Sequence, residues 1–260
     1  MISTTSSLCH YTSFEVLTHI LNEDTLKTKN MSFWFSNPLQ TNDKKEVRFF
    51  EEYIFKNKNG KSLQSKIDKL KNNIGNPYTL SLIHHKIEKK SYPPCEIPMW
   101  RMYGDNFKGL RLVFKYGKLK QFCQNNGLSL LECKYLTKSD MNILAREIRQ
   151  VMSSSNILDS SFETLYKEAV CYKTYDWAYE KEWRIVKWTN DIVNMGYRPA
   201  NGRLYYPIKI PLDLLETIVI GPKADQEAIE GSLNLIKKKL GDMPENHFKI
   251  VKSKLQIGYI

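Results

Sequence analysis

Two glutamates and an arginine alternate along one short segment of the chain, at Glu180, Glu182 and Arg184. If this segment is extended, the three side chains point to the same side, because side chains alternate along a strand. Two carboxylates and a guanidinium on one face are costly to bury unless they pair or take part in a reaction. A carboxylate placed in this way could hold a ribose 2′-hydroxyl and stabilise an oxocarbenium-like centre. The alternative is a ladder of salt bridges on an exposed strand face.

Three further segments contain side chains suited to ligand binding. His10 stands at the expected end of a strand, where its ring could donate a hydrogen bond to a hydroxyl group, or could serve the fold alone. Trp100 and Tyr103 share a face if residues 99–103 form a helix, and could stack on a flat ring such as nicotinamide or a base. A buried aromatic anchor is the alternative for this pair. In the segment 37–46, Asp43 or Thr41 could simply cap a helix.

Composition restricts the class of protein. The chain has 260 residues with 42% hydrophobic side chains, which excludes intrinsic disorder as a description of the whole chain. Its formal charge of +11 favours nucleic acid or another polyanion as a partner, although solubility alone explains the same charge. The five cysteines are scattered without a C-x-x-C pair, residues 1–7 lack the basic and apolar regions typical of a signal peptide, and no apolar run reaches the length of a membrane span. We therefore expect a cytoplasmic protein with no membrane partner.

Hydrophobic periodicity predicts mixed helices and strands without regular alternation, so the expected class is α+β. A capping box at residues 12–15 predicts a helix, and residues 26–35 look extended. Residues 51–92 are interpreted as an inserted Lys-rich helical segment, and residues 224–260 as a C-terminal helix and strand. Further helices are expected near 99–103, 141–151, 161–171 and 224–240, and further strands near 109–116, 128–135, 183–188, 203–210, 217–220 and 247–257. The whole chain, 1–260, is expected to form one domain.

Several common sites are absent from the sequence. No G-x-G-x-x-G, Walker-type phosphate loop or G-x-S-x-G motif occurs. His84 and His85 are adjacent, and neighbouring side chains diverge, so they form a poor joint metal site. We expect no bound metal in the favoured interpretation.

The ordered set of motifs resembles a bacterial family known as domain of unknown function 2971. The resemblance covers about residues 8–225 and departs from the family pattern at Met102, where members often have His. The motifs that carry it are His10-Tyr11-Thr12-Ser13, Ser36-Asn37-Pro38 with Asn42-Asp43 and Glu46, Met99-Trp100 with Tyr103, Lys108-Gly109, Trp177 with Glu180-Lys181-Glu182-Trp183-Arg184, and Ile218-Val219-Ile220-Gly221-Pro222.

The opening motif also resembles that of ADP-ribosyltransferase-fold proteins, including DarT-like toxins that modify DNA. This resemblance implies split mixed and antiparallel sheets around an NAD cleft. It implies Glu182, Glu180 and Arg184 as catalytic residues, with Glu182 as the first choice for the catalytic glutamate. The residues it implies for binding NAD, which is the substrate, are His10, Tyr11, Thr12, Asn42, Trp100 and Tyr103.

The expected function is therefore transfer of ADP-ribose from NAD to RNA or DNA. Such an activity would suit a bacterial toxin or phage-defence effector held in check by an antitoxin or another regulatory protein. One alternative is a metal-dependent nuclease that uses Asp43, Glu46, Glu180 and Glu182 around Mg²⁺. Another is a nucleic-acid-binding module without catalytic activity.

Overall fold

The structure is a computed structural model, and it describes residues 7–38, 65, 68–70, 72–85, 96–154, 160–191, 193–198, 203–241 and 248–255. These residues form an α+β structure with both parallel and antiparallel strand pairs. They divide into two compact units: unit 1 is residues 1–33, 81–126 and 208–260, and unit 2 is residues 34–80 and 127–207. The chain passes between the units within β2 (Asn30–Ser36), β3 (Asn76–His85) and β10 (Arg203–Pro211). None of the described helices is long and apolar enough to cross a membrane.

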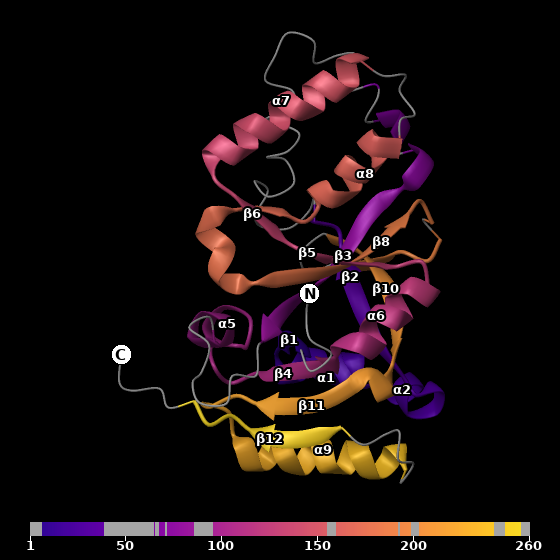
Figure 1. Cartoon of the computed structure of the whole chain (residues 1–260). Coiled ribbons are helices and arrows are strands. Elements are labelled where there is room, and N and C mark those ends of the chain that lie inside the picture. Colours follow the sequence, from indigo (N-terminus) through magenta and orange to yellow (C-terminus); the bar gives the residue numbers. More distant parts are fainter. Residues whose placement is uncertain are drawn as a thin grey trace. The chain divides into compact units, whose positions relative to one another are not determined.

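Unit 1 is built around strands in the order β12-β11-β4-β1-β3. All neighbouring pairs are antiparallel except β11 with β12, which are parallel and are connected through α9. Figure 1 shows α9 lying along these two strands. The elements of this unit, besides its parts of β2, β3 and β10, are β1 (Ser7–Thr12), α1 (Phe14–Ile20), α2 (Glu23–Thr28), α5 (Glu96–Met102), β4 (Leu110–Lys115), α6 (Tyr116–Asn125), the 3-10 turn η3 (Leu212–Leu214), β11 (Leu215–Ile220), α9 (Gln226–Leu240) and β12 (Lys249–Lys252).

The core of unit 1 follows the sequence pattern of its strands. β4 alternates buried and half-buried side chains, with Leu110, Leu112 and Phe114 inside, as a strand with one core face requires. Phe33 of β2 meets Phe114 edge to face, with ring centroids 6.0 Å apart. The last three residues of β11, 218–220, are all buried. Strand alternation therefore identified the main core strand of this unit correctly.

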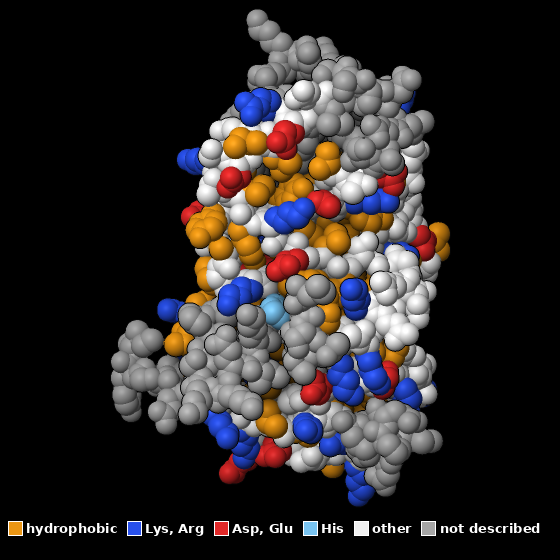
Figure 2. Space-filling view, viewed as in Figure 1, with side chains coloured by type: hydrophobic (Ala, Val, Ile, Leu, Met, Phe, Trp, Pro, Cys, Tyr) orange, Lys and Arg blue, Asp and Glu red, His pale blue; other side chains and the backbone are white. Residues whose placement is uncertain are grey.

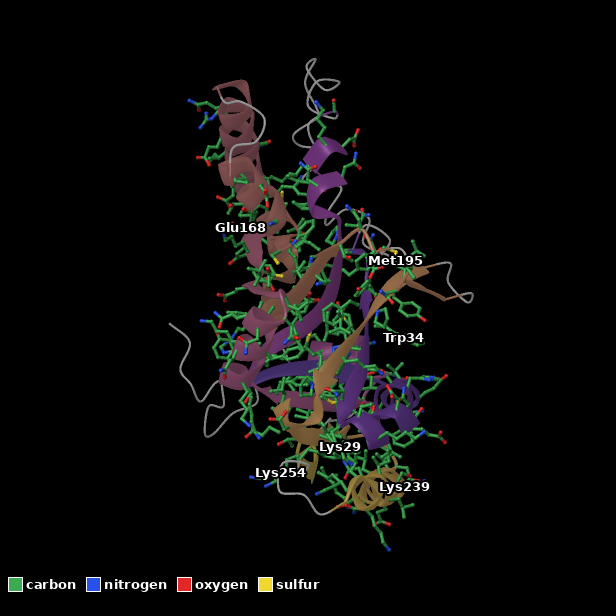
Figure 3. All side chains as sticks on the ribbon, turned by 90° about the vertical axis from the view of Figure 1, so that its right-hand side faces the viewer. Lys29, Trp34, Glu168, Met195, Lys239 and Lys254 are labelled. Carbon is green, nitrogen blue, oxygen red and sulfur yellow. The ribbon has the colours of Figure 1, made fainter. Side chains whose placement is uncertain are left out.

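Local capping sets the helices near the N-terminus of unit 1. Ser13 caps α1, because its hydroxyl accepts a hydrogen bond from the backbone N–H of Val16 at 3.1 Å. Asn22 caps α2 in the same way, and α2 therefore occupies residues 23–28, which corrects the expectation that the chain is extended from residue 26. Lys29 then ends α2 with a left-handed backbone, and its Nζ donates to the carbonyl of Leu240 at the end of α9, 2.7 Å away. Figure 3 shows Lys29 near the end of α9 that carries Lys239.

Unit 2 contains a strand group and a pair of helices. β5 pairs antiparallel with β8, and β8 also pairs with β3. β6 and β7 form a separate parallel pair, and α7 lies beside α8 (Figure 1). The elements of this unit, besides its parts of β2, β3 and β10, are β5 (Ser129–Glu132), β6 (Lys134–Leu136), α7 (Lys138–Ser154), α8 (Ser160–Ala169), β7 (Tyr172–Thr174), the 3-10 turn η2 (Tyr175–Glu180), β8 (Glu182–Thr189) and β9 (Gly196–Arg198).

An aromatic stack closes one edge of unit 2. Trp34 of β2 stacks on Tyr205 of β10, with centroids 4.3 Å apart and ring planes 19° apart. The Tyr205 ring also covers Gly196 on β9, where a Cβ atom would approach the ring to 2.1 Å. Trp34 and Met195 lie along this edge in Figure 3, and the Tyr78 hydroxyl contacts the Met195 sulfur at 3.1 Å. A glycine is therefore required at position 196 for the ring to lie flat against the backbone.

The expected helical insertion at 51–92 is wrong over residues 76–85. These residues form β3, in which Tyr78, Leu80 and Leu82 are buried on alternate positions. The prediction was based on the Lys-rich composition of the whole segment. The two-residue alternation that specifies a strand is confined to these ten residues. Most of the remaining segment lies outside the described residues, as do Asn42, Asp43 and Glu46.

Candidate functional site

Glu182 and Arg184 begin β8, and the strand geometry brings their side chains together. The guanidinium Nε of Arg184 donates to Oε1 of Glu182 at 2.8 Å, and its Nη2 donates to Oε2 at 3.1 Å. This is a bidentate pair in which both carboxylate oxygens are held. Arg184 also donates from Nη1 to the backbone carbonyl of Val170. The predicted placement of these two residues on one strand face is therefore confirmed.

Lys173 of β7 joins Glu180 to this pair. Its Nζ donates to Oε2 of Glu182 at 2.8 Å and to Oε2 of Glu180. The segment before β8 is a 3-10 turn rather than a strand, so the condition of extended backbone does not hold at Glu180. Lys181 takes a left-handed backbone, with φ 48° and ψ 46°, between the turn and the strand. This left-handed residue lies between the two glutamates, and both glutamates contact the same lysine.

The four side chains form a buried charge cluster, defined here as Lys173, Glu180, Glu182 and Arg184. Their exposed fractions are 6%, 1%, 2% and 4%. The exposed salt-bridge ladder considered from the sequence is therefore wrong. Two positive and two negative charges sum to zero, and such compensation is what allows ionised groups to be buried.

The electrostatic balance keeps Glu182 ionised. Burial alone would raise the pKa of its carboxyl group, but the charges and hydrogen bonds of Arg184 and Lys173 lower that pKa from 4.5 to about 2. Glu182 is consequently a fixed carboxylate at neutral pH. It can accept hydrogen bonds or stabilise positive charge, but it is a poor proton donor.

The surroundings of the buried charge cluster further restrict its chemistry. The Tyr135 hydroxyl accepts a hydrogen bond from the backbone N–H of Glu182 at 2.7 Å, which fixes the start of β8. The Lys173 ammonium lies 5.4 Å from the centroid of the Trp177 ring. Cys133 makes a side-chain hydrogen bond with Cys171, and burial raises the pKa of the Cys133 thiol well above its usual range. A neutral thiol of this kind is a weak nucleophile.

Sequence reasoning missed Lys173 and Tyr135. Lys173 is the one charged residue in the short strand β7, and it follows the apolar run Ala169-Val170-Cys171. A lone lysine in such a setting is a usable signal of a buried charge, because burial of lysine requires a partner. Tyr135 lacks any comparable local signal.

In unit 1, the residues expected to bind NAD have partners within the fold. His10 shares a hydrogen bond between its Nδ1 and the backbone carbonyl of Ser81 at 3.0 Å, and burial lowers the pKa of its ring. Tyr11 meets Trp100 edge to face at 5.0 Å, and Tyr11 and Thr12 are both buried. The neutral imidazole of His10 and the hydroxyl of Tyr11 are thus held in position.

Trp100 and Tyr103 differ in accessibility. Helix α5 ends at Met102, so Tyr103 leaves the helix and is 44% exposed, whereas Trp100 is 0% exposed. A ring without exposed surface has no face to offer a nicotinamide or a base in this conformation. The core-anchor alternative therefore applies to Trp100, and Tyr103 is the accessible aromatic ring of the pair.

The two groups of predicted residues belong to different units. Glu180, Glu182 and Arg184 are brought together in unit 2, and Tyr11 and Trp100 in unit 1. No group of three or more His, Cys, Asp or Glu side chains that could hold a metal occurs among the described residues. Lysine and arginine side chains on the face shown in Figure 2 are interspersed with acidic and hydrophobic ones.

Comparisons with known proteins cover part of this arrangement. No curated protein and no solved structure matches the chain. One family model does match, over residues 99–185, and these include Trp100, Tyr103 and the buried charge cluster with all four of its members. The opening His10 motif and the late Gly221-Pro222 motif lie outside the matched residues. The matching model is that of the family described as "Protein of unknown function (DUF2971)", and the family resemblance expected from the sequence is confirmed over residues 99–185.

Proposed function

We propose that the protein transfers ADP-ribose from NAD to a nucleic acid, with Glu182 as the catalytic carboxylate. The observation that supports this proposal is the state of Glu182, a carboxylate held ionised and oriented by Arg184 and Lys173. Loss of nicotinamide develops positive charge at the ribose C1 carbon. A carboxylate whose position is fixed in advance stabilises such charge without reorganisation at the moment of reaction.

The contacts of Glu182 suggest how the ribose would gain access to it. Both carboxylate oxygens already accept hydrogen bonds, and 2% of the residue is exposed, so a ribose 2′-hydroxyl reaches the carboxylate only if a neighbouring side chain moves. Lys173 is the partner best able to yield, because its ammonium also contacts Glu180 and the Trp177 ring. Arg184 would remain bound to Oε1 and keep the carboxylate in place. Trp177 and Glu180 both belong to η2, and we therefore propose that the ribose approaches Glu182 from the side of this turn.

The nucleic-acid acceptor is supported by charge. The chain carries a formal +11, which favours encounter with a polyanion. In the proposed reaction the bond between C1 of the ribose and nicotinamide breaks, and nicotinamide leaves with the bonding electrons. A nucleophilic atom of the acceptor forms the new bond to C1. An activity of this type is consistent with a toxin or defence effector that a regulatory protein restrains.

The test is incubation of the full chain with labelled NAD and, separately, RNA, DNA or total cell protein. We expect nicotinamide release together with label on the nucleic acid, and a rate on the order of 10² lower for Glu182→Gln. Glu180→Gln should retain more activity, because Glu180 contacts Lys173 rather than the ribose. Glu132→Gln, which removes an exposed carboxylate from β5, is the matched control and should be unchanged.

Circular dichroism of each variant separates loss of catalysis from loss of folding. Absence of nicotinamide release by the wild type with every acceptor would refute the proposal. A folded Glu182→Gln variant with full activity would also refute the assigned role of Glu182.

A further inference from the structure

Arg111 of β4, in unit 1, makes its hydrogen bonds to the described residues through one side of its guanidinium group. Its Nη1 donates to Oε1 of Glu96 at 2.7 Å and contacts the Tyr11 hydroxyl at 3.4 Å. Its Nε is buried and makes no hydrogen bond within the described part of the chain. Among the described residues, the hydrogen bonds of this side chain therefore use Nη1, and the Nε–H group has no acceptor.

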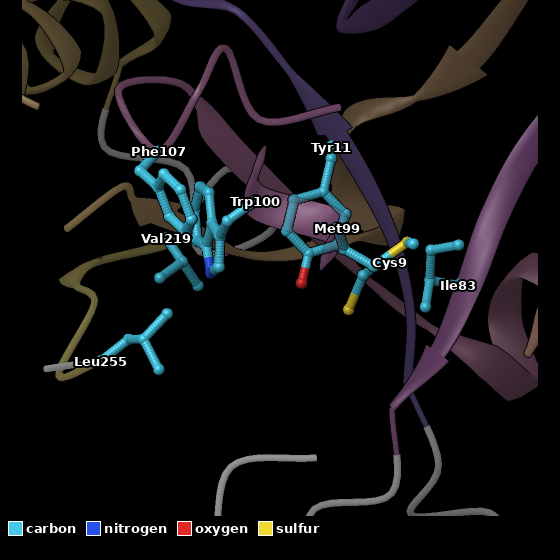
Figure 4. Close-up of a cluster of buried hydrophobic side chains, with 8 residues drawn as sticks. All are labelled: Cys9, Tyr11, Ile83, Met99, Trp100, Phe107, Val219 and Leu255. Atoms are coloured by element: carbon cyan, nitrogen blue, oxygen red, sulfur yellow. The ribbon is translucent and has the colours of Figure 1, made fainter. Parts of the chain in front are cut away.

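The surrounding residues hold this guanidinium in a fixed position. Arg111 lies opposite Tyr11 of β1 on one side and Val219 of β11 on the other. Its central carbon lies 6.0 Å from the Tyr11 ring centroid and 5.9 Å from that of Trp100. Figure 4 shows the hydroxyl of Tyr11 and the indole nitrogen of Trp100 directed to the same side of this apolar cluster. A guanidinium fixed on two sides loses little further freedom when it binds a ligand.

Glu96 sets the orientation of the pair. Its Oε1 accepts from Arg111 and lies 3.4 Å from the indole Nε1 of Trp100. The Glu96 side chain is 3% exposed, whereas the Arg111 side chain is 18% exposed, so the arginine is the member of the pair that solvent reaches. Burial raises the pKa of Tyr11, and its hydroxyl stays neutral. Lys223, whose ammonium lies 5.2 Å from the Phe107 ring, adds positive charge to the same cluster.

We propose that Arg111 is the anchor of an oxoanion-binding site that accepts a carboxylate or a phosphate group on its Nε–Nη2 edge. This edge presents two parallel N–H groups, a geometry that matches two oxygens of one oxoanion. A buried N–H group without an acceptor is unfavourable, and a ligand oxygen would supply the acceptor that Nε lacks among the described residues. The inference goes beyond the proposed function, because it requires neither NAD nor Glu182.

Isothermal titration calorimetry of the full chain tests this site, with inorganic phosphate, pyrophosphate and acetate at constant ionic strength. We expect saturable binding of at least one of these ions. Comparison of the affinities for acetate and phosphate shows whether the site prefers a carboxylate or a phosphate group. Arg111→Lys keeps the positive charge beside Glu96 but removes the planar fork, so affinity should fall about tenfold or more. Arg101→Gln removes an exposed arginine of α5 and should bind as the wild type does.

A second variant keeps the proposal testable if Arg111→Lys does not fold. Glu96→Gln retains an oxygen acceptor for Arg111 but removes the competing negative charge, so the same ions should bind more tightly. Unchanged binding in folded Arg111→Lys, equal loss in Arg101→Gln, or unchanged affinity in Glu96→Gln would each overturn the proposal. Wild-type protein that binds none of the three ions would also overturn it.

Discussion

Removal of the Glu182 charge should destabilise unit 2 and should do so in a pH-dependent way. The pKa of this carboxyl group falls from 4.5 in its ordinary state to about 2 in the folded protein, a difference of about 2.5. Each tenfold change in proton affinity is worth about 1.4 kcal/mol, so ionised Glu182 contributes about 3 kcal/mol to folding at neutral pH. The same figure follows from experience with buried ion pairs, where removal of one partner costs about 3–5 kcal/mol.

The sign of the pH effect follows from the lowered pKa. Above pH 4.5 the carboxyl group is ionised in both the folded and the unfolded chain, and its full contribution is present. As the pH falls from 4.5 towards 2, the unfolded chain takes up a proton that the folded protein does not, and the contribution is lost. The stability gap between wild type and Glu182→Gln should therefore be constant at neutral pH and should narrow below pH 4.5.

Charge counting supplies an internal check. Glu182→Gln leaves the buried charge cluster at +1, whereas Lys173→Met leaves it at −1, and the double variant returns it to zero. Each single variant should lose about 3 kcal/mol, and the double variant should recover more than half of the summed loss, because the two sites are in direct contact. Glu132→Gln is the surface control and should stay within about 0.5 kcal/mol of wild type.

Urea denaturation followed by tryptophan fluorescence measures these differences, since Trp177 and Trp183 lie in the same unit. The reasoning fails if Glu182→Gln is as stable as wild type at neutral pH. It also fails if the gap stays constant as the solution is acidified, or if the double variant shows purely additive losses.

Three further variants test particular contacts. Gly196→Ala should lower stability by about 1–3 kcal/mol, because its Cβ would lie 2.1 Å from the Tyr205 ring, and an unchanged melting temperature would contradict that packing. Tyr135→Phe removes the acceptor for the Glu182 N–H and should cost about 1–3 kcal/mol, with faster amide exchange at the start of β8; protection equal to wild type would argue against the bond. Trp100→Ala should cost about 3–5 kcal/mol in chemical denaturation, and a loss below about 1 kcal/mol would show that the ring is not a core anchor.

The sequence predicted strands and helices correctly where the hydrophobic pattern was local and regular. The alternation of Leu110, Leu112 and Phe114 specified β4, and the apolar face around Leu233 and Leu240 specified α9. Such patterns reflect a period of two or 3.6 residues, which the sequence displays directly. The class α+β could be predicted for the same reason.

The candidate site could be predicted only in part, because its geometry depends on one unusual backbone residue and on a distant strand. Two-residue spacing placed Glu182 beside Arg184 correctly. The left-handed backbone at Lys181 has no signal in the sequence, since glycine is the residue expected there. Lys173 contacts the pair through the fold of β7, which no local periodicity predicts.

The contacts of Arg111 show the same limit in unit 1. Glu96 is fifteen positions earlier in the sequence, on a different element, and only the packing of α5 against β4 brings the two side chains together. Trp100 and Tyr103 show the opposite error, because the three-residue spacing was correct but the helix ended before Tyr103. Helix ends are less well specified by sequence than helix interiors.

The chain passes between the two units within three strands, and this affects the order in which strand pairs can form during synthesis on the ribosome. β4 of unit 1 pairs with β1, about a hundred residues earlier, and with β11, about a hundred residues later. The pairing of β4 with β11 therefore cannot form until the segment after residue 208 has been made, by which time all of unit 2 has left the peptidyl transferase centre. Long sequence separations of this kind slow folding and prolong the exposure of unpaired strands. Neither unit corresponds to a continuous stretch of chain, and a fragment that ends before residue 208 would lack β11 and its contribution to the core of unit 1.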